Sequence, residues 1–422
     1  MNILIKNSYI YSEFDSNKKT EKLLKDISIK NGKIDQILDT GNFNEGDFSK
    51  VIDAKGNLVT PPFIDPHIHL DKILINEVVR ENVTGTLKEA IEIIWEKKKN
   101  YDLEDIRERA GRIIREAISH GTLYMRTHVD IDTIGGLKPL EGVLLAKEDY
   151  KDIFHLEIVA FPQEGIIKDP GCEELMYKAM EMGADIVGGM PASENCPEDS
   201  LKHVQIVFDI AEKFNCPIDM HVDETDDPFF RTLEMTADEI VSRNFQPSVT
   251  AGHTCALASY DKKYAEYVMD KVKKTGINMI TNPVTNLMLQ GRFDDYPKRR
   301  GLTRVKELVN LGVNVAFGQD CIKDTFYPLG RADMLEVGNI LCHAAHMSLP
   351  HEILEVFDMP LFKSSKLLGL DNYGIKEGGA ADLVIIDTDN PIEALRLNSD
   401  RLFVIKDGVV LASTKTEKKM YL

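Results

Sequence analysis

Eight short runs of apolar and β-branched residues, separated by helical patterns, constrain the fold of this chain of 422 residues more than any other feature. In two of the helical patterns, apolar residues recur three and four positions apart, as in Leu87, Ala90, Ile91 and Ile94, and in Ile106, Ala110, Ile113, Ile114 and Ala117, which Gly121 closes. Strands that alternate with helices form parallel sheets, and eight such units close into a (β/α)8 barrel of the TIM type. The predicted strands cover residues 60–67, 123–129, 155–161, 185–190, 217–222, 248–252, 277–282 and 313–318.

Further short strands are predicted on both sides of the barrel in the sequence. Each is bounded by turn residues such as Asn-Gly, and they cover residues 3–5, 27–34, 51–59, 378–387 and 402–410. We expect the two groups to join in one β domain that is discontinuous in sequence. The predicted domain limits are residues 1–60 and 369–422 for the β domain and residues 61–368 for the barrel.

The composition excludes several classes of partner and site. A net charge of −18 opposes binding to nucleic acid or to anionic lipid, and the basic run at residues 97–99 is most simply a solvated helix end. No apolar run reaches the roughly 18 residues of a membrane span, and the first residues resemble a strand rather than a signal peptide, so a cytoplasmic location is expected. The six cysteines form no Cys-x-x-Cys pair, which argues against disulfides and against the cysteine-ligated zinc deaminases.

Polar side chains gather where the predicted barrel strands end. In such a barrel the carboxyl ends of the strands converge on one face, and functional side chains meet there. The first strand ends in Pro-His-Ile-His-Leu-Asp, and its two histidines lie two residues apart, so both imidazoles can point to the same side. The polar residues at or just after the strand ends are His67, His69, His128, Asp130, Gln163, His221, Glu224, His253, Asn282, Asn286 and Asp320.

Four of these residues have the chemistry of a hydrolytic metal site. His67, His69, His221 and Asp320 supply three imidazoles and a carboxylate, and such a site keeps one position open for water. The ligand set suits either Fe²⁺ or Zn²⁺. Because the strand at residues 185–190 ends without a lysine or glutamate that could bridge two ions, we expect one divalent transition metal per chain.

Three further residues have predicted roles beside the metal. Glu224, three residues after His221, is expected to move protons between water and substrate as general acid/base, and His253 is expected to stabilise the attacking hydroxide. Asp320 can accept the second proton of the water. Gln163 offers an amide donor and an acceptor to the edge of a heterocycle. Without these roles, Glu224 would be an ordinary loop carboxylate, His253 a buried core histidine and Gln163 a loop cap. His128 and Asp130 are expected to support the metal ligands.

These motifs carry a resemblance to a known family. Pro-His-Ile-His-Leu-Asp, Val-Ala-Phe-Pro-Gln-Glu-Gly, His-Val-Asp-Glu, Gly-His-Thr, the block from Gln290 to Gly301 and Asp320 with Tyr-Pro-Leu-Gly at 327–330 resemble the bacterial cytosine deaminases of the amidohydrolase superfamily over nearly the whole chain. The resemblance implies a mononuclear barrel enzyme with a β-sandwich side domain, usually a homo-oligomer. It gives the same roles to the four metal ligands, Glu224, His253 and Gln163, and it implies a place in pyrimidine salvage.

The chain departs from this family where the substrate ring is expected. Those deaminases have a second acidic residue after the metal aspartate and a tryptophan a few positions on, whereas this chain has Cys321 and Phe326. Residues 190–194 replace a bulky His-Phe pair. The resemblance makes Cys321 and Phe326 substrate-binding residues and places Cys321 near C5 of a pyrimidine.

The predicted function is hydrolytic deamination of cytosine or a close analogue, including 5-methylcytosine, to the oxo-pyrimidine and ammonia. The same fold leaves open a deaminase of another cyclic amidine or lactam, such as creatinine or isoguanine, and an amidohydrolase that dealkylates aminotriazines. A catalytically silent barrel that serves as a scaffold is the alternative from another class.

Overall fold

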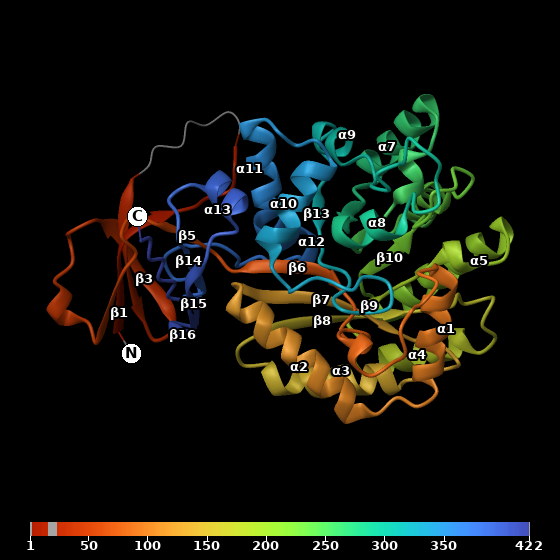
Figure 1. Ribbon diagram of the computed structural model, residues 1–422, viewed down its shortest axis with the longest axis horizontal. Helices are drawn as coiled ribbons and strands as arrows, with labels where there is room; N and C mark the ends of the chain where they lie inside the picture. The colour runs from red at the N-terminus through yellow and green to blue at the C-terminus, as the bar shows by residue number, and fades with distance from the viewer. Residues whose placement is uncertain (1, 16–22, 422) are drawn as a thin grey trace.

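The computed structural model describes residues 2–15 and 23–421, and it shows a barrel beside a smaller β domain (Figure 1). Eight parallel strands form the barrel, in the order of the sequence. Their bounds are β6 Phe63–Ile68, β7 Thr122–Asp130, β8 His155–Phe161, β9 Ile186–Val187, β10 Ile218–Val222, β11 Val249–His253, β12 Asn278–Thr281 and β13 Val315–Phe317. The predicted (β/α)8 fold class is confirmed.

The end of the first barrel strand, β6, meets the residues that follow the last strand, β13. Ile68 and Asp320 form a parallel bridge, and the Asp320 backbone N–H donates to the carbonyl of His67 over 2.7 Å. The barrel therefore closes at the same point where the predicted metal ligands of β6 and of the β13 loop lie.

Helices cover the outside of the barrel, as expected for strands buried on both faces. The first two end where the sequence predicts, and α2 stops just before Gly121, whose φ is +86°. The helices are α1 Leu87–Lys98, α2 Leu103–Ser119, α3 Lys138–Tyr150, α4 Cys172–Met182, α5 Pro197–Phe214, α6 Thr232–Arg243, α7 Lys262–Thr275, α8 Pro283–Leu289, α9 Val305–Asn310, α10 Met334–Ala344, α11 Pro350–Asp358, α12 Ser364–Leu368 and α13 Pro391–Leu397. In the described part of the chain, no helix combines the length and the apolar character that crossing a membrane requires.

Strands from both ends of the chain share a second sheet (Figure 1). Its order is β16-β15-β14-β5-β1-β2-β3, with β4 paired to β1, so β14 from the C-terminal part lies against β5 from the N-terminal part. This confirms that the terminal strands join, although the domain limits stay predictions. The strands are β1 Asn2–Ile10, β2 Leu24–Lys30, β3 Lys33–Asp39, β4 Lys50–Asp53, β5 Leu58–Thr60, β14 Leu383–Ile386, β15 Arg401–Lys406 and β16 Val409–Ser413.

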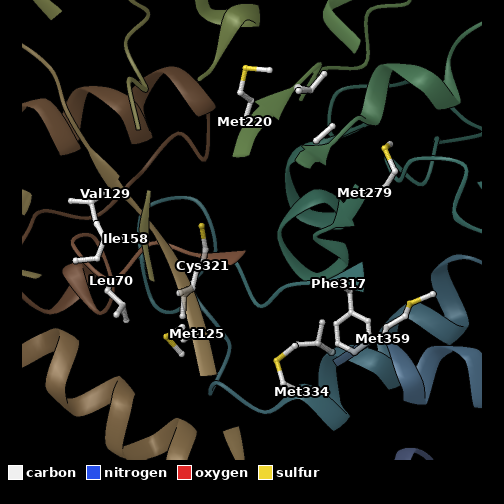
Figure 2. Close-up of a cluster of buried hydrophobic side chains, with 14 of the residues drawn as sticks. Leu70, Met125, Val129, Ile158, Met220, Met279, Phe317, Cys321, Met334 and Met359 are labelled. Atoms are coloured by element: carbon white, nitrogen blue, oxygen red, sulfur yellow. The ribbon is translucent and has the colours of Figure 1, made fainter. Parts of the chain in front are cut away.

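The alternation of side chains along the barrel strands separates an apolar layer from a polar interior. Met125 and Val129 of β7 belong to the hydrophobic core shown in Figure 2, together with Met220 of β10. Arg126, next to Met125 on β7, points to the other side and makes an ion pair with Asp219 of β10 over 2.8 Å. In β7 and β10, one face of the strand thus stabilises the fold, and the other holds polar groups.

Candidate metal centre and active site

Three imidazoles and one carboxylate converge on one point at the carboxyl end of the barrel. Nε2 of His69 lies 3.1 Å from Nε2 of His221 and 3.3 Å from Oδ1 of Asp320. Nε2 of His67 lies 3.6 Å from the same carboxylate oxygen. The ligand atoms of all four residues lie within 4.8 Å of one another. The structure thus brings together the four predicted ligands from β6, β10 and the loop after β13.

The imidazoles are held in the neutral form that binds metals. Burial, with the positive charges and imidazoles around them, holds the pKa of His67, His69 and His221 well below its usual range. Nδ1 of His69 lies 3.2 Å from the carbonyl oxygen of His128 and donates to it, which leaves Nε2 with a free lone pair. His128 therefore orients a ligand through its backbone, in line with its predicted supporting role.

The donor set fits a divalent transition metal. Nε2 of His67 and Oδ2 of Asp320 are buried without a hydrogen-bond partner among the described residues. Nε2 of His69 faces Nε2 of His221, and two unprotonated ring nitrogens cannot form a hydrogen bond with one another. A divalent cation between these atoms would satisfy all of them, and imidazole with carboxylate is a ligand set that such ions prefer.

The backbone at the site is shaped for close approach. A Cβ on Gly318, just after β13, would lie 2.6 Å from the Cβ and the carbonyl oxygen of His67, so only glycine lets the two strand ends meet. His253 and Asp320 have φ values of 66° and 65°, a left-handed conformation that is uncommon outside glycine. Such strain is held in place by the surrounding structure and is concentrated at functional sites.

Glu224 lies beside His253 at the edge of the same cluster. Its Oε1 is 3.1 Å from Nδ1 of His253 and accepts a hydrogen bond from the amide of Asn286 over 3.3 Å. The amide nitrogens of Asn282 and Asn286 each lie 3.0 Å from a ring nitrogen of His253. Burial lowers the pKa of His253, but the carboxylates of Glu224 and Asp320 and the contact with Asn286 raise it, and the net pKa is raised. These contacts fix the imidazole and leave Glu224 facing the centre.

The acidic loop after β10 is ordered by a different carboxylate. Asp223 is buried and accepts hydrogen bonds from the backbone and hydroxyl of Thr232 and from the backbone of Leu233, at the start of α6. These bonds tie Asp223 to the N-terminus of the helix. The neighbouring Glu224 therefore projects into the cavity from an anchored position rather than from a loose loop.

One cavity joins the cluster to the predicted substrate residues. Its apolar wall includes Phe161 at the end of β8, Met190 and Leu289 at the end of α8. All the predicted site residues lie along it except His67, which is fully buried. The predicted site residues that line this cavity are His69, Gln163, His221, Glu224, His253, Asp320, Cys321 and Phe326.

Asp130 takes part in a buried ion network beside the cavity. Its carboxylate lies 2.6 Å from Nζ of Lys72 and 2.6 Å from Nζ of Lys98. Lys98 is fully buried, so the expectation that residues 97–99 form a solvated helix end is wrong at this residue. The end of α1 points Lys98 inward, where it also pairs with Asp132 and Glu164.

Lys72 is the cavity residue that sequence reasoning missed. It follows the Pro-His-Ile-His-Leu-Asp motif directly and lines the cavity, although it is only 2% exposed. The signal was a single lysine between Leu70 and the apolar run at residues 73–75, because a lysine in an apolar segment needs a specific partner.

Comparisons with known proteins agree with this geometry. The family model described as "Amidohydrolase family" matches residues 50–412. A solved structure of 5-methylcytosine deaminase from Klebsiella pneumoniae, liganded with 5-fluorocytosine, is 39% identical and superposes with a TM-score of 0.92 over 100% of this chain and 99% of that chain. The resemblance to deaminases of the amidohydrolase superfamily is thereby confirmed.

Two curated relatives extend the range of reactions among similar proteins. The N-isopropylammelide isopropyl amidohydrolase of Pseudomonas sp. (strain ADP) is 30% identical over 97% of this chain and 96% of its own length. The pterin deaminase of Rhizobium rhizogenes is 32% identical over 93% of this chain and 89% of its own length. The chain therefore belongs to the amidohydrolase family and is a hydrolase that acts on carbon–nitrogen bonds.

Proposed function

We propose that this enzyme deaminates cytosine or a close analogue such as 5-methylcytosine, giving the oxo-pyrimidine and ammonia. The observation that carries the proposal is the cluster of four predicted metal ligands, three of which line one cavity together with Glu224 and Gln163. The similarity to a 5-methylcytosine deaminase over the full length of the chain supports the choice of ring.

His67, His69, His221 and Asp320 would hold one divalent ion, either Fe²⁺ or Zn²⁺. Such an ion makes water available as a nucleophile near neutral pH. No second ion is expected, because the carboxylate of Glu194, in the loop after β9, accepts backbone N–H groups of Ile166, Ile167 and Lys168 instead.

The chain's own carboxylates account for both protons of the attacking water. As the oxygen forms a bond to C4 of the ring, Glu224 takes one proton and delivers it to the neighbouring ring nitrogen. Asp320 has an unpartnered Oδ2 that accepts the second proton and passes it to the amino group. The C4–N bond then breaks, and ammonia leaves. His253, fixed by its two asparagines, stabilises the oxygen during attack.

A second candidate is hydrolysis of another aminated ring, such as isoguanine, creatinine, a pterin or an N-alkylated aminotriazine. The observation in its favour is the identity of 30% to 32% with an isopropylammelide amidohydrolase and a pterin deaminase. Cys321 and Phe326, which differ from the residues of the bacterial cytosine deaminases, line the cavity, where their size and polarity affect which ring fits.

A substrate panel tests the proposal. Ammonia release is measured with cytosine, 5-methylcytosine, isoguanine, creatinine, pterin and an N-alkylated aminotriazine, alongside metal analysis of the purified protein. We expect about one transition metal per chain and the highest kcat/KM with cytosine or 5-methylcytosine. Activity on creatinine or an aminotriazine alone would move the assignment to the second candidate, and metal far below one per chain would favour the scaffold.

Cys321 is expected to let the cavity accept a methyl group at C5. The side chain is 4% exposed and packs in the apolar core (Figure 2), and burial raises the pKa of its thiol well above the usual range, so the group is neutral. Burying one methyl contributes about 0.8 kcal/mol, and a carboxylate at this position would add a desolvation cost of similar or larger size. Together these terms correspond to a preference of about tenfold or more.

The prediction is that kcat/KM for 5-methylcytosine is at least comparable to that for cytosine and that Cys321→Asp shifts the ratio about tenfold toward cytosine. Cys321→Ser is the matched control, because it keeps a small neutral side chain and should keep the wild-type ratio. Strong discrimination against 5-methylcytosine by the unmodified enzyme would contradict this account of the cavity.

We further propose, from the sequence and the family resemblance, a cytoplasmic homo-oligomer with a role in pyrimidine salvage. The net charge of −18 supports a small-molecule substrate rather than nucleic acid or a membrane surface.

A further inference from the structure

Lys72 connects the metal-binding strand to the residue expected to recognise the substrate. It lies three residues after His69, and its Nζ donates to Oδ1 of Asp130 over 2.6 Å and to Oε1 of Gln163. Lysine has no acceptor, so the amide of Gln163 must turn its oxygen toward Lys72. The orientation of this amide therefore follows from chemistry and not from a choice between two similar atoms.

The backbone of Gln163 is fixed as firmly as its side chain. Its N–H donates to the carbonyl of Phe161 over 3.1 Å, and its carbonyl accepts from the hydroxyl of Ser193 over 2.9 Å. The loop that follows is held by Glu194, whose carboxylate also lies 2.8 Å from Nδ1 of the buried His203. Gln163 is thus placed before any substrate arrives.

The free end of the amide faces the cavity. Among the described residues, Nε2 of Gln163 has no hydrogen-bond partner, whereas Oε1 is occupied by Lys72. Both Lys72 and Gln163 line the cavity, but Nζ of Lys72 is bonded to Asp130 and Gln163, so the amide N–H of Gln163 is the group left to meet a substrate. A substrate group that meets this wall must accept hydrogen bonds.

We propose that Lys72 is a positioning residue that fixes the Gln163 amide as a hydrogen-bond donor and thereby selects substrates with a ring carbonyl oxygen. This inference rests on the proposed deaminase function and sharpens it. From the sequence, Gln163 is expected to offer both a donor and an acceptor to the substrate. Because its acceptor oxygen is bonded to Lys72, only its donor remains for the substrate. A ring without an acceptor at this position would leave the amide N–H unpaired in the cavity, which is costly.

Lys98 provides a matched comparison within the same network. It is as deeply buried as Lys72 and contacts the same carboxylate, that of Asp130. Its other partners are Asp132 and Glu164, and it neither contacts Gln163 nor lines the cavity. Loss of Lys98 removes a buried cation and its ion pairs without removing the contact to the amide.

The test compares a substrate that has the ring carbonyl with one that lacks it. kcat and KM are measured for cytosine and for 4-aminopyrimidine, and inhibition constants are measured where turnover is too slow. For Lys72→Met we expect kcat/KM for cytosine to fall about tenfold or more, chiefly through KM, with a much smaller change for 4-aminopyrimidine. The discrimination between the two rings should therefore shrink.

Control variants separate this role from a structural one. Lys98→Met should lower the melting temperature but keep the wild-type discrimination. Gln163→Leu should lose the same discrimination, and Lys72→Met should have little further effect in that background, because the two residues act as one unit. If Lys72→Met does not fold, the double variant Lys72→Met/Asp130→Asn removes the charge imbalance and gives the same readout.

The outcomes distinguish the inference from the function on which it rests. If the unmodified enzyme deaminates cytosine but a folded Lys72 variant discriminates as well as the wild type, the positioning role is overturned and the function stands. If the enzyme deaminates no ring that carries a carbonyl oxygen, the proposed function fails and the inference fails with it.

Discussion

Replacing Glu224 with glutamine is expected to leave the metal bound and to lower kcat by about 10²–10⁴-fold or more. The carboxylate is 3.1 Å from Nδ1 of His253 and lies on the cavity that three of the predicted metal ligands also line. Glutamine keeps the size and the contact to Asn286 but cannot carry a proton between water and the ring. Because Glu224 is not one of the four converging ligands, metal content should stay near that of the wild type.

Glu164→Gln is the matched control for this variant. Glu164 is also a carboxylate at the carboxyl end of the barrel, but its partner is Lys98, to which a glutamine oxygen can still bind. We expect kcat to change little. A Glu224→Gln enzyme with nearly normal kcat and full metal content would remove Glu224 from the mechanism.

The ends of the barrel strands could be predicted closely because each apolar run stops at a polar residue. The strands predicted at residues 217–222 and 248–252 correspond to β10 and β11 within one residue at each end. Apolar runs buried on both faces define the strands, and the first polar residue after each run marks the mouth of the barrel. The predicted metal ligands could be identified for the same reason, because three imidazoles and a carboxylate fall at these strand ends.

The strand predicted at residues 185–190 is shorter in the structure. β9 covers only Ile186–Val187, and the chain then passes close to β8, where a Cβ on Gly188 would lie 2.6 Å from the carbonyl oxygen of Ala160. The glycines indicate this approach, but sequence alone does not say that it ends the strand.

Contacts between long side chains could not be read from the sequence at all. Lys72 meets Asp130 and Gln163, which belong to two other strand ends, and Lys98 turns inward from a helix end that looks solvated. A lysine has many conformations, and only the assembled barrel selects among them. The same limit applies to Asn282 and Asn286: the sequence places both near a strand end, but only the fold brings both amides to His253.

Asp320→Ala is expected to abolish turnover and to lower the bound metal well below one per chain. Oδ1 of Asp320 is the oxygen nearest to the imidazoles, and Oδ2 is free to accept a proton, so one substitution removes a ligand and a proton acceptor together. The loss should exceed that of Glu224→Gln, which removes only proton transfer. Metal analysis and ammonia release on the same preparation give both readouts.

Asp324→Asn is the control, because Asp324 is a buried carboxylate in the same loop. It accepts backbone hydrogen bonds from Phe326 and Tyr327, and an asparagine oxygen can still accept them. This variant should keep its metal, and Asp320→Asn, which preserves shape but loses the charge, should behave like Asp320→Ala. Three neutral imidazoles without an anionic ligand bind a divalent ion less tightly and leave it more positive, so weakened metal binding and lost turnover should appear together. An Asp320→Ala protein that kept one metal per chain and measurable deamination would show that the carboxylate is not part of the centre.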